Sequence, residues 1–180
     1  LAEVHETHRD EPAAAAELWI GLRGEKDLSV DSAEALSRLF ARLDRWAEYA
    51  GLIEAELESC EDDAGRADAF RRLGEVRLEH LEDVAGAVAA WRQGLVASPG
   101  AVDLLRALRP VLVEHHSAAE ALEVGEALRL HHPDDLVLLR SQAILYAEVE
   151  DAAAALGCWE AILEHAPLDP QALGAVEGAF

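Results

Sequence analysis

The sequence contains no methionine, two cysteines and few aromatic residues, which make up 5% of its 180 positions. Without a methionine, Leu1 is not expected to be a translation start, and no signal peptide is visible. Two cysteines, Cys60 and Cys158, cannot form a disulfide framework or a metal site by themselves. We expect Cys158 to be a small core residue, and free cysteines indicate a reducing compartment, which favours a cytoplasmic location.

Long apolar runs and positive charge are also scarce. The longest uncharged apolar run falls well short of the roughly 18–20 residues that span a bilayer, so we expect no membrane partner. The formal charge is −21, from 36 acidic against 15 basic residues. An acidic surface repels phosphate, which makes nucleic acids and anionic membranes unexpected partners. We expect most of the acids to form a solvated outer face.

Alanine and leucine are abundant and dominate the apolar residues, which make up 51% of the chain. This bias favours helix over strand. The six prolines and 12 glycines cluster between periodic segments. The composition therefore predicts a soluble, all-α protein.

Three columns of residues recur along the chain with a step of 34 positions. These columns are Pro99, Pro133 and Pro167; Ala87, Ala121 and Ala155; and Trp91, Gly125 and Trp159. A fixed period of this length indicates one supersecondary unit that is copied and stacked. Such an array offers a long surface for partners and usually no enclosed active site.

Each unit of this period reads as a helical hairpin, with two apolar-periodic segments, a short turn and a closing proline. In the last complete unit we expect helices at 136–149 and 152–165. The other expected helices lie at 32–43, 46–59, 67–80, 102–114 and 119–130, with a further one through 87–95.

These hairpins resemble tetratricopeptide repeats, a family of 34-residue helix-turn-helix units. The residues of one unit that carry most of the family pattern are Phe70, Leu73, Gly74, Ala87, Trp91, Leu95 and Pro99. The resemblance implies an all-α, right-handed α-solenoid of about five repeats. It covers essentially the whole chain, because the start matches a later segment at an offset of 72 residues.

We therefore predict a single array over 1–180. Its parts are a partial repeat 1 at 1–27, repeat 2 at 28–62, repeat 3 at 63–100, repeat 4 at 101–134, repeat 5 at 135–168, and the start of a further repeat or cap at 169–180. Both ends read as cut, so we expect a fragment of a longer array.

Repeat 4 departs from the pattern at two positions. Gly125 replaces the aromatic residue and should leave less side-chain volume there. Pro110 falls inside the first helix, which it should kink or shorten because it removes one backbone hydrogen bond. We expect repeat 4 to be the weakest unit.

Neither a metal site nor a catalytic site is expected. Adjacent histidines such as His131 and His132 point about 100° apart on a helix and rarely chelate one ion. His5 and His8 share a face but have no third ligand. No carboxylate pair, phosphate loop or metalloprotease motif is arranged for catalysis. We predict a non-enzymatic chain without cofactors.

Arginines form a further column at Arg71, Arg106 and Arg140, spaced 35 and 34 residues apart. The resemblance places them at the fifth position of successive first helices, which line the concave groove of such arrays. Arginine forks pair with carboxylates, so this stripe could hold an acidic peptide or a chain terminus. The alternative is that each arginine pairs with nearby acids, such as Asp68 or Glu75, and binds nothing.

The leading hypothesis is an interaction module that binds a peptide or protein segment, with acidic and apolar residues, in this groove. The expected groove residues are Arg38, Arg42, Arg71, Arg72, Glu75, Arg106, Val113, Arg140, Ser141 and Ile144. The competing hypothesis is a structural or self-associating spacer, in which uncapped ends make a homo-oligomer.

Overall fold

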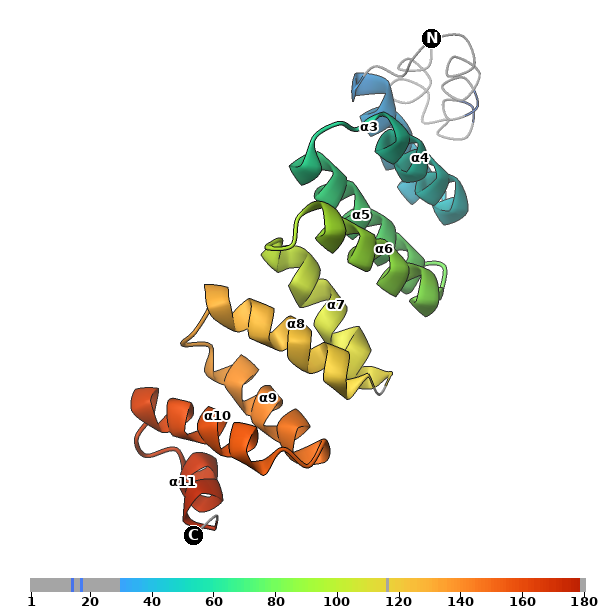
Figure 1. Cartoon of the computed structure of the whole chain (residues 1–180). Coiled ribbons are helices and arrows are strands. Elements are labelled where there is room, and N and C mark those ends of the chain that lie inside the picture. The colour runs from blue at the N-terminus through green and yellow to red at the C-terminus, as the bar shows by residue number, and fades with distance from the viewer. Residues whose placement is uncertain (1–13, 15–16, 18–29, 116, 179–180) are drawn as a thin grey trace. The chain divides into compact units, whose positions relative to one another are not determined.

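The computed structural model describes residues 14, 17, 30–115 and 117–178 (Figure 1). Every regular element within these residues is an α-helix, and none of the described helices is long and apolar enough to cross a membrane. The chain divides into two compact units, Leu1–Ala97 and Ser98–Phe180. The predicted repeat 1 at 1–27 lies outside the described residues, apart from Ala14 and Glu17, and so do His5 and His8.

The first unit contains four described helices, in which each helix packs against the next. They are α3 (Val30–Arg42), α4 (Trp46–Ser59), α5 (Asp63–Glu79) and α6 (Val84–Ala97). The prediction for α4 is confirmed. Helix α5 begins four residues before the expected position 67, because the carboxylate of Asp62 accepts a hydrogen bond from the Gly65 N–H at 2.7 Å and starts the helix there.

The second unit contains five described helices, again packed in sequence order. They are α7 (Val102–Glu114), α8 (Ala118–His131), α9 (Leu136–Glu148), α10 (Ala152–His165) and α11 (Pro170–Glu177). The bounds predicted for α7 and α10 are confirmed. Pro110 does not shorten α7. Its ring is exposed and it costs the helix a single backbone hydrogen bond, whose acceptor can turn to solvent.

Aspartate side chains start most of these helices. A carboxylate at the N-cap accepts hydrogen bonds from backbone N–H groups of the first turn, which have no partner within the helix. The capping residues, each with acceptor distances between 2.7 and 3.1 Å, are Asp62, Asp83, Asp135, Asp151 and Asp169. Part of the chain's excess of acid is therefore structural.

The turns inside the hairpins share a left-handed residue. Asp44, Glu82 and Glu150 have φ angles of 54°, 53° and 61°. In repeat 5 the turn closes through the Asp151 N–H, which bonds the Tyr146 carbonyl at 2.8 Å. This is the Schellman arrangement, which satisfies carbonyl groups at the end of the first helix.

Repeat 3 is held together by a small residue facing a large one. Trp91 on α6 is 1% exposed. Its ring lies over Gly74 on α5, where a Cβ would meet the indole Nε1 at 2.1 Å. This arrangement lets the two helices approach closely while the ring fills the space between them.

Repeat 4 reverses this arrangement. Gly125 stands in the tryptophan column, and Arg109 stands 35 residues after Gly74. A Cβ at Gly125 would lie 3.1 Å from Arg109 Nε and 2.8 Å from Gln142 Nε2. The side-chain volume that we expected to be missing is thus partly supplied by two polar side chains from α7 and α9.

Candidate binding face

The arginines predicted to line the groove of repeat 3 form an ion-pair cluster on α5. Arg71 contacts Asp68 at 2.8 Å and Glu75 at 2.6 Å. Arg72 contacts Asp68 at 3.1 Å and Glu56 of α4 at 2.6 Å. Asp68 therefore bridges both guanidinium groups, and three carboxylates surround two arginines.

The pKa shifts in this cluster agree with its geometry. The hydrogen bond from Asp68 raises the pKa of Arg71, although partial burial opposes it. Burial raises the pKa of Asp68, but the two arginines together lower it overall. The alternative that Arg71 pairs with nearby acids is what the structure contains, so this end of the column is not a positive stripe.

Arg140 is tied to the next helix along the chain. Its Nη1 donates to Gln171 Oε1 at 2.6 Å, and its Nη2 pairs with the carboxylate of Asp169, whose side chain is 8% exposed. The Ala172 N–H and then Arg140 lower the pKa of Asp169. This arginine holds the start of α11 against α9.

Arg106 is the member of the column with a different partner. It is exposed on α7, and its Nη2 lies 3.1 Å from Nε2 of His132, which follows α8. An arginine only donates, so the histidine nitrogen is the acceptor in this contact. Among the described residues, no carboxylate forms an ion pair with Arg106.

The remaining predicted groove residues lie in both units. Val113 and Ile144 are exposed on α7 and α9, and the Ser141 hydroxyl donates to the Leu138 carbonyl at 2.9 Å. Arg38 and Arg42 are exposed on α3, and both have partners. The structure thus brings five of the ten predicted residues to α7 and α9 of the second unit.

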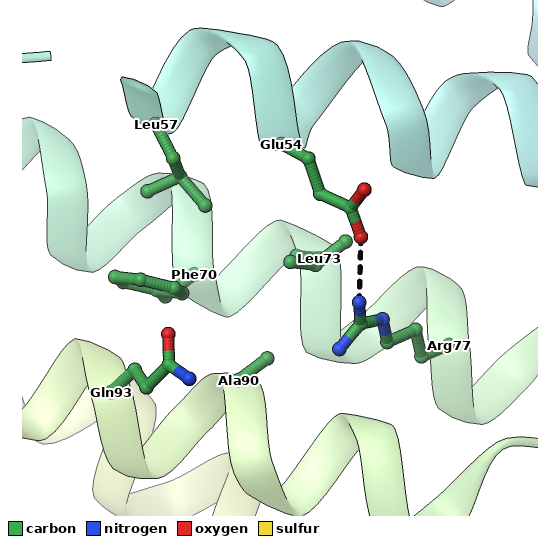
Figure 2. Close-up of a pocket in the computed structure, with 7 residues that line it drawn as sticks. All are labelled: Glu54, Leu57, Phe70, Leu73, Arg77, Ala90 and Gln93. Carbon is green, nitrogen blue, oxygen red and sulfur yellow. Dashed lines mark hydrogen bonds and ion pairs between the residues drawn. The ribbon is translucent and has the colours of Figure 1, made fainter. Parts of the chain in front are cut away.

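A second candidate is a hollow in the first unit that sequence reasoning missed (Figure 2). It has a volume of about 260 Å³ and lies between α4, α5 and α6. Glu54 and Arg77 form an ion pair at 2.6 Å on one side, and Gln93 lies on the other. Its apolar lining consists of Leu57, Phe70, Leu73 and Ala90.

The signal for this hollow was in the repeat itself. Arg77 stands 69 residues before Tyr146, in the position where the repeat pattern has an aromatic residue. A guanidinium that turns away to Glu54 and to the Gly86 carbonyl leaves the space beside Phe70 open. The departure from the pattern at this position would have located the hollow.

Two further sequence predictions concern cysteine and metal chemistry. Cys158 is buried, as predicted, and burial raises the pKa of its thiol. It and Cys60 are both free cysteines. The described part of the chain contains no group of three or more histidine, cysteine or carboxylate side chains that could hold a metal ion.

Comparison with known proteins gives no matching family model and no matching curated sequence. Solved structures do match. A tetratricopeptide repeat protein from Parabacteroides merdae aligns with a TM-score of 0.63 at 14% identity, over 81% of this chain and 56% of that one. MamA from AMB-1 aligns at 0.62 with 17% identity, over 97% and 92%. This chain has the tetratricopeptide-repeat fold.

The tetratricopeptide fold also matches YrrB, a protein described as having an unusual peptide-binding site, with a TM-score of 0.59 and 17% identity over 98% of this chain and 88% of YrrB. Identities this low establish the fold and not the ligand. The α-solenoid class and the repeat resemblance predicted from the sequence are confirmed.

Proposed function

We propose that this chain is a non-enzymatic interaction module that binds an extended peptide or protein segment along the concave face formed by its first helices. The fold supports a role in protein interaction, because tetratricopeptide solenoids expose long surfaces built from repeated helices. The peptide-binding site described for YrrB supports the same class of partner.

The observation that carries the proposal is the state of Arg106. The guanidinium groups of Arg71 and Arg140 already contact carboxylates, so a ligand carboxylate would have to compete for them. Arg106 is exposed and contacts only the neutral acceptor of His132 among the described residues. A ligand carboxylate would gain a bidentate contact there without displacing an ion pair.

Exposed apolar side chains accompany Arg106. Val113 lies seven residues further along α7, which places it on the same side of the helix. Val137 and Ile144 are likewise seven residues apart on α9, and they are 76% and 54% exposed. We name Arg106, Val113, Val137 and Ile144 the α7/α9 face, and its ligand is a segment that carries both a carboxylate and apolar side chains.

A peptide array tests this proposal. The full chain is applied to an array of random dodecapeptides, and the peptides that it binds are measured again with Arg106→Glu and with Val113→Ser/Ile144→Ser. Both variants should weaken binding by at least about tenfold, which corresponds to one lost charge-assisted contact. Arg66→Glu, which makes the same charge change at another exposed arginine, is the control.

Other outcomes count against the proposal. Equal binding by all variants would move the site away from the α7/α9 face, and selection of basic peptides would contradict the carboxylate. A mass that rises with concentration in the absence of peptide would favour the self-associating spacer, for which Leu168, 88% exposed just before α11, is the nearest apolar candidate. A cytoplasmic location stays a prediction.

A further inference from the structure

Three buried polar atoms of the second unit have no hydrogen-bond partner among the described residues. They are Nε and Nη2 of Arg109 on α7 and Oε1 of Gln142 on α9. Gln142 is completely buried. Buried donors and acceptors in proteins are almost always hydrogen-bonded, and each one left alone costs free energy, so these three atoms require a partner.

The side chains that carry these atoms converge on Gly125 of α8. A Cβ at this glycine would lie 3.1 Å from Arg109 Nε and 3.1 Å from Gln142 Cδ. The tryptophan column that fills repeat 3 is empty of side-chain atoms here, because glycine has none. The two polar groups therefore face one small space between three helices.

The nearest carboxylate is already engaged. Glu126 Oε1 accepts hydrogen bonds from Gln142 Nε2 at 2.9 Å and from the Tyr146 hydroxyl at 3.0 Å. Glu126 Oε2 pairs with Arg129 at 2.7 Å. Burial lowers the pKa of Arg109, with only a longer-range contribution from Asp135 against it, so Arg109 lacks a close carboxylate partner.

We propose that the space over Gly125 holds one bound water molecule, which accepts hydrogen bonds from Arg109 and donates one to Gln142 Oε1. The occupant must both accept and donate, because the unsatisfied atoms are two donors and one acceptor. A carboxylate or phosphate only accepts and would face the amide oxygen, while a metal ion would face the guanidinium. Internal waters typically make about three hydrogen bonds of this kind.

The bound water completes a polar chain across the hairpin joint. Arg109 of α7 reaches Gln142 of α9 through the water, and Gln142 reaches Glu126 of α8 directly. Repeat 3 joins its helices through the dry contact of Trp91 with Gly74. Repeat 4 thus replaces an apolar joint by a hydrated one.

Two measurements on the full chain test this proposal. A crystal structure at a resolution that shows ordered water should contain one peak within hydrogen-bond distance of Arg109 Nε or Nη2 and Gln142 Oε1. Magnetic relaxation dispersion of the water oxygen should count one long-lived internal water fewer in Arg109→Met/Gln142→Leu. This double change removes donors and acceptor together, so it leaves no polar group stranded.

Matched glycine variants sharpen the count. Gly125→Ala should displace the water, because its methyl group would enter the space. Gly157→Ala, whose Cβ would have nothing within 4 Å, should keep it. A direct bond from Arg109 to a protein oxygen, an anion in the density, or an unchanged water count in the double variant would overturn the proposal. The crystal structure decides even where a variant does not fold.

Discussion

Trp91 and Gly74 form a single packing unit that joins α5 to α6. The indole Nε1 donates a hydrogen bond to the Arg71 carbonyl at 3.1 Å, and the ring occupies the place where a Gly74 side chain would be. The largest buried side chain of the described core is therefore matched to a residue without a side chain. Two predictions depend on this match.

Trp91→Ala should lower the free energy of unfolding by about 3–5 kcal/mol, because it removes a fully buried aromatic ring and leaves a cavity. Urea denaturation followed by circular dichroism measures the change. A cost below about 1 kcal/mol would mean that the ring does not hold the repeat together.

Gly74→Ala should also destabilise the chain, because its Cβ would overlap the indole ring. In the Trp91→Ala background the same change should gain up to about 1 kcal/mol, since alanine is the better helix former. A double-mutant cycle measures this coupling. Gly51→Ala, which has nothing within 4 Å of its Cβ, is the control and should stabilise in either background.

Asp151→Ala should lower stability by about 1 kcal/mol, the usual cost of losing an N-cap side chain. The carboxylate of Asp151 accepts from the Ala154 N–H at 3.0 Å and starts α10. Hydrogen exchange should accelerate in the first turn of α10. Asp151→Asn keeps an acceptor at this position, so it should retain most of the protection; equal loss in both variants would point to charge instead of capping.

Glu150→Gly should raise the free energy of unfolding by up to about 1 kcal/mol, because glycine adopts a positive φ without the steric cost that other residues carry. The φ of Glu150 is 61°. Glu148→Gly makes the same change two residues earlier, inside α9, and should lower stability by a similar amount. Thermal melting of the two variants should therefore shift in opposite directions.

Tyr146 should ionise late and make stability fall at alkaline pH. Burial, and then its hydrogen bond to Glu126, raises the pKa of Tyr146 to about 12 from 10.0. The unfolded chain loses this proton first, so the contribution is complete below about pH 10 and is lost as the pH rises toward about 12. Absorbance at alkaline pH should show this late transition in the native chain and not in Tyr146→Phe; a transition near 10 would contradict it.

Much of the fold could be predicted because the apolar spacing and the turn residues agree. Helices α4, α7 and α10 begin and end where the sequence placed them. Helix α5 begins earlier than predicted, because residues 63–66 carry no periodic apolar side chain and only the cap at Asp62 marks its start. Capping depends on one hydrogen bond, which a hydrophobic pattern does not contain.

The candidate site was less predictable. The partners of Arg71 lie three and four residues away on the same helix, so they could be named from the sequence. The contact of Arg140 with Asp169 spans 29 residues and depends on how α9 meets α11. Arg109 reads as an ordinary surface residue, and only its place in the Gly74 column, opposite Gly125, marks it as interior.

The aspartate caps set a limit on how this acidic chain can change its charge. Neutralising surface acids is a common way to shift an isoelectric point, and most of the 36 acidic residues leave room for it. At the five capping positions the same exchange would loosen the start of a helix. Redesign of the electrostatics, in evolution or in the laboratory, should therefore spare these aspartates and act on glutamates that bond no backbone amide.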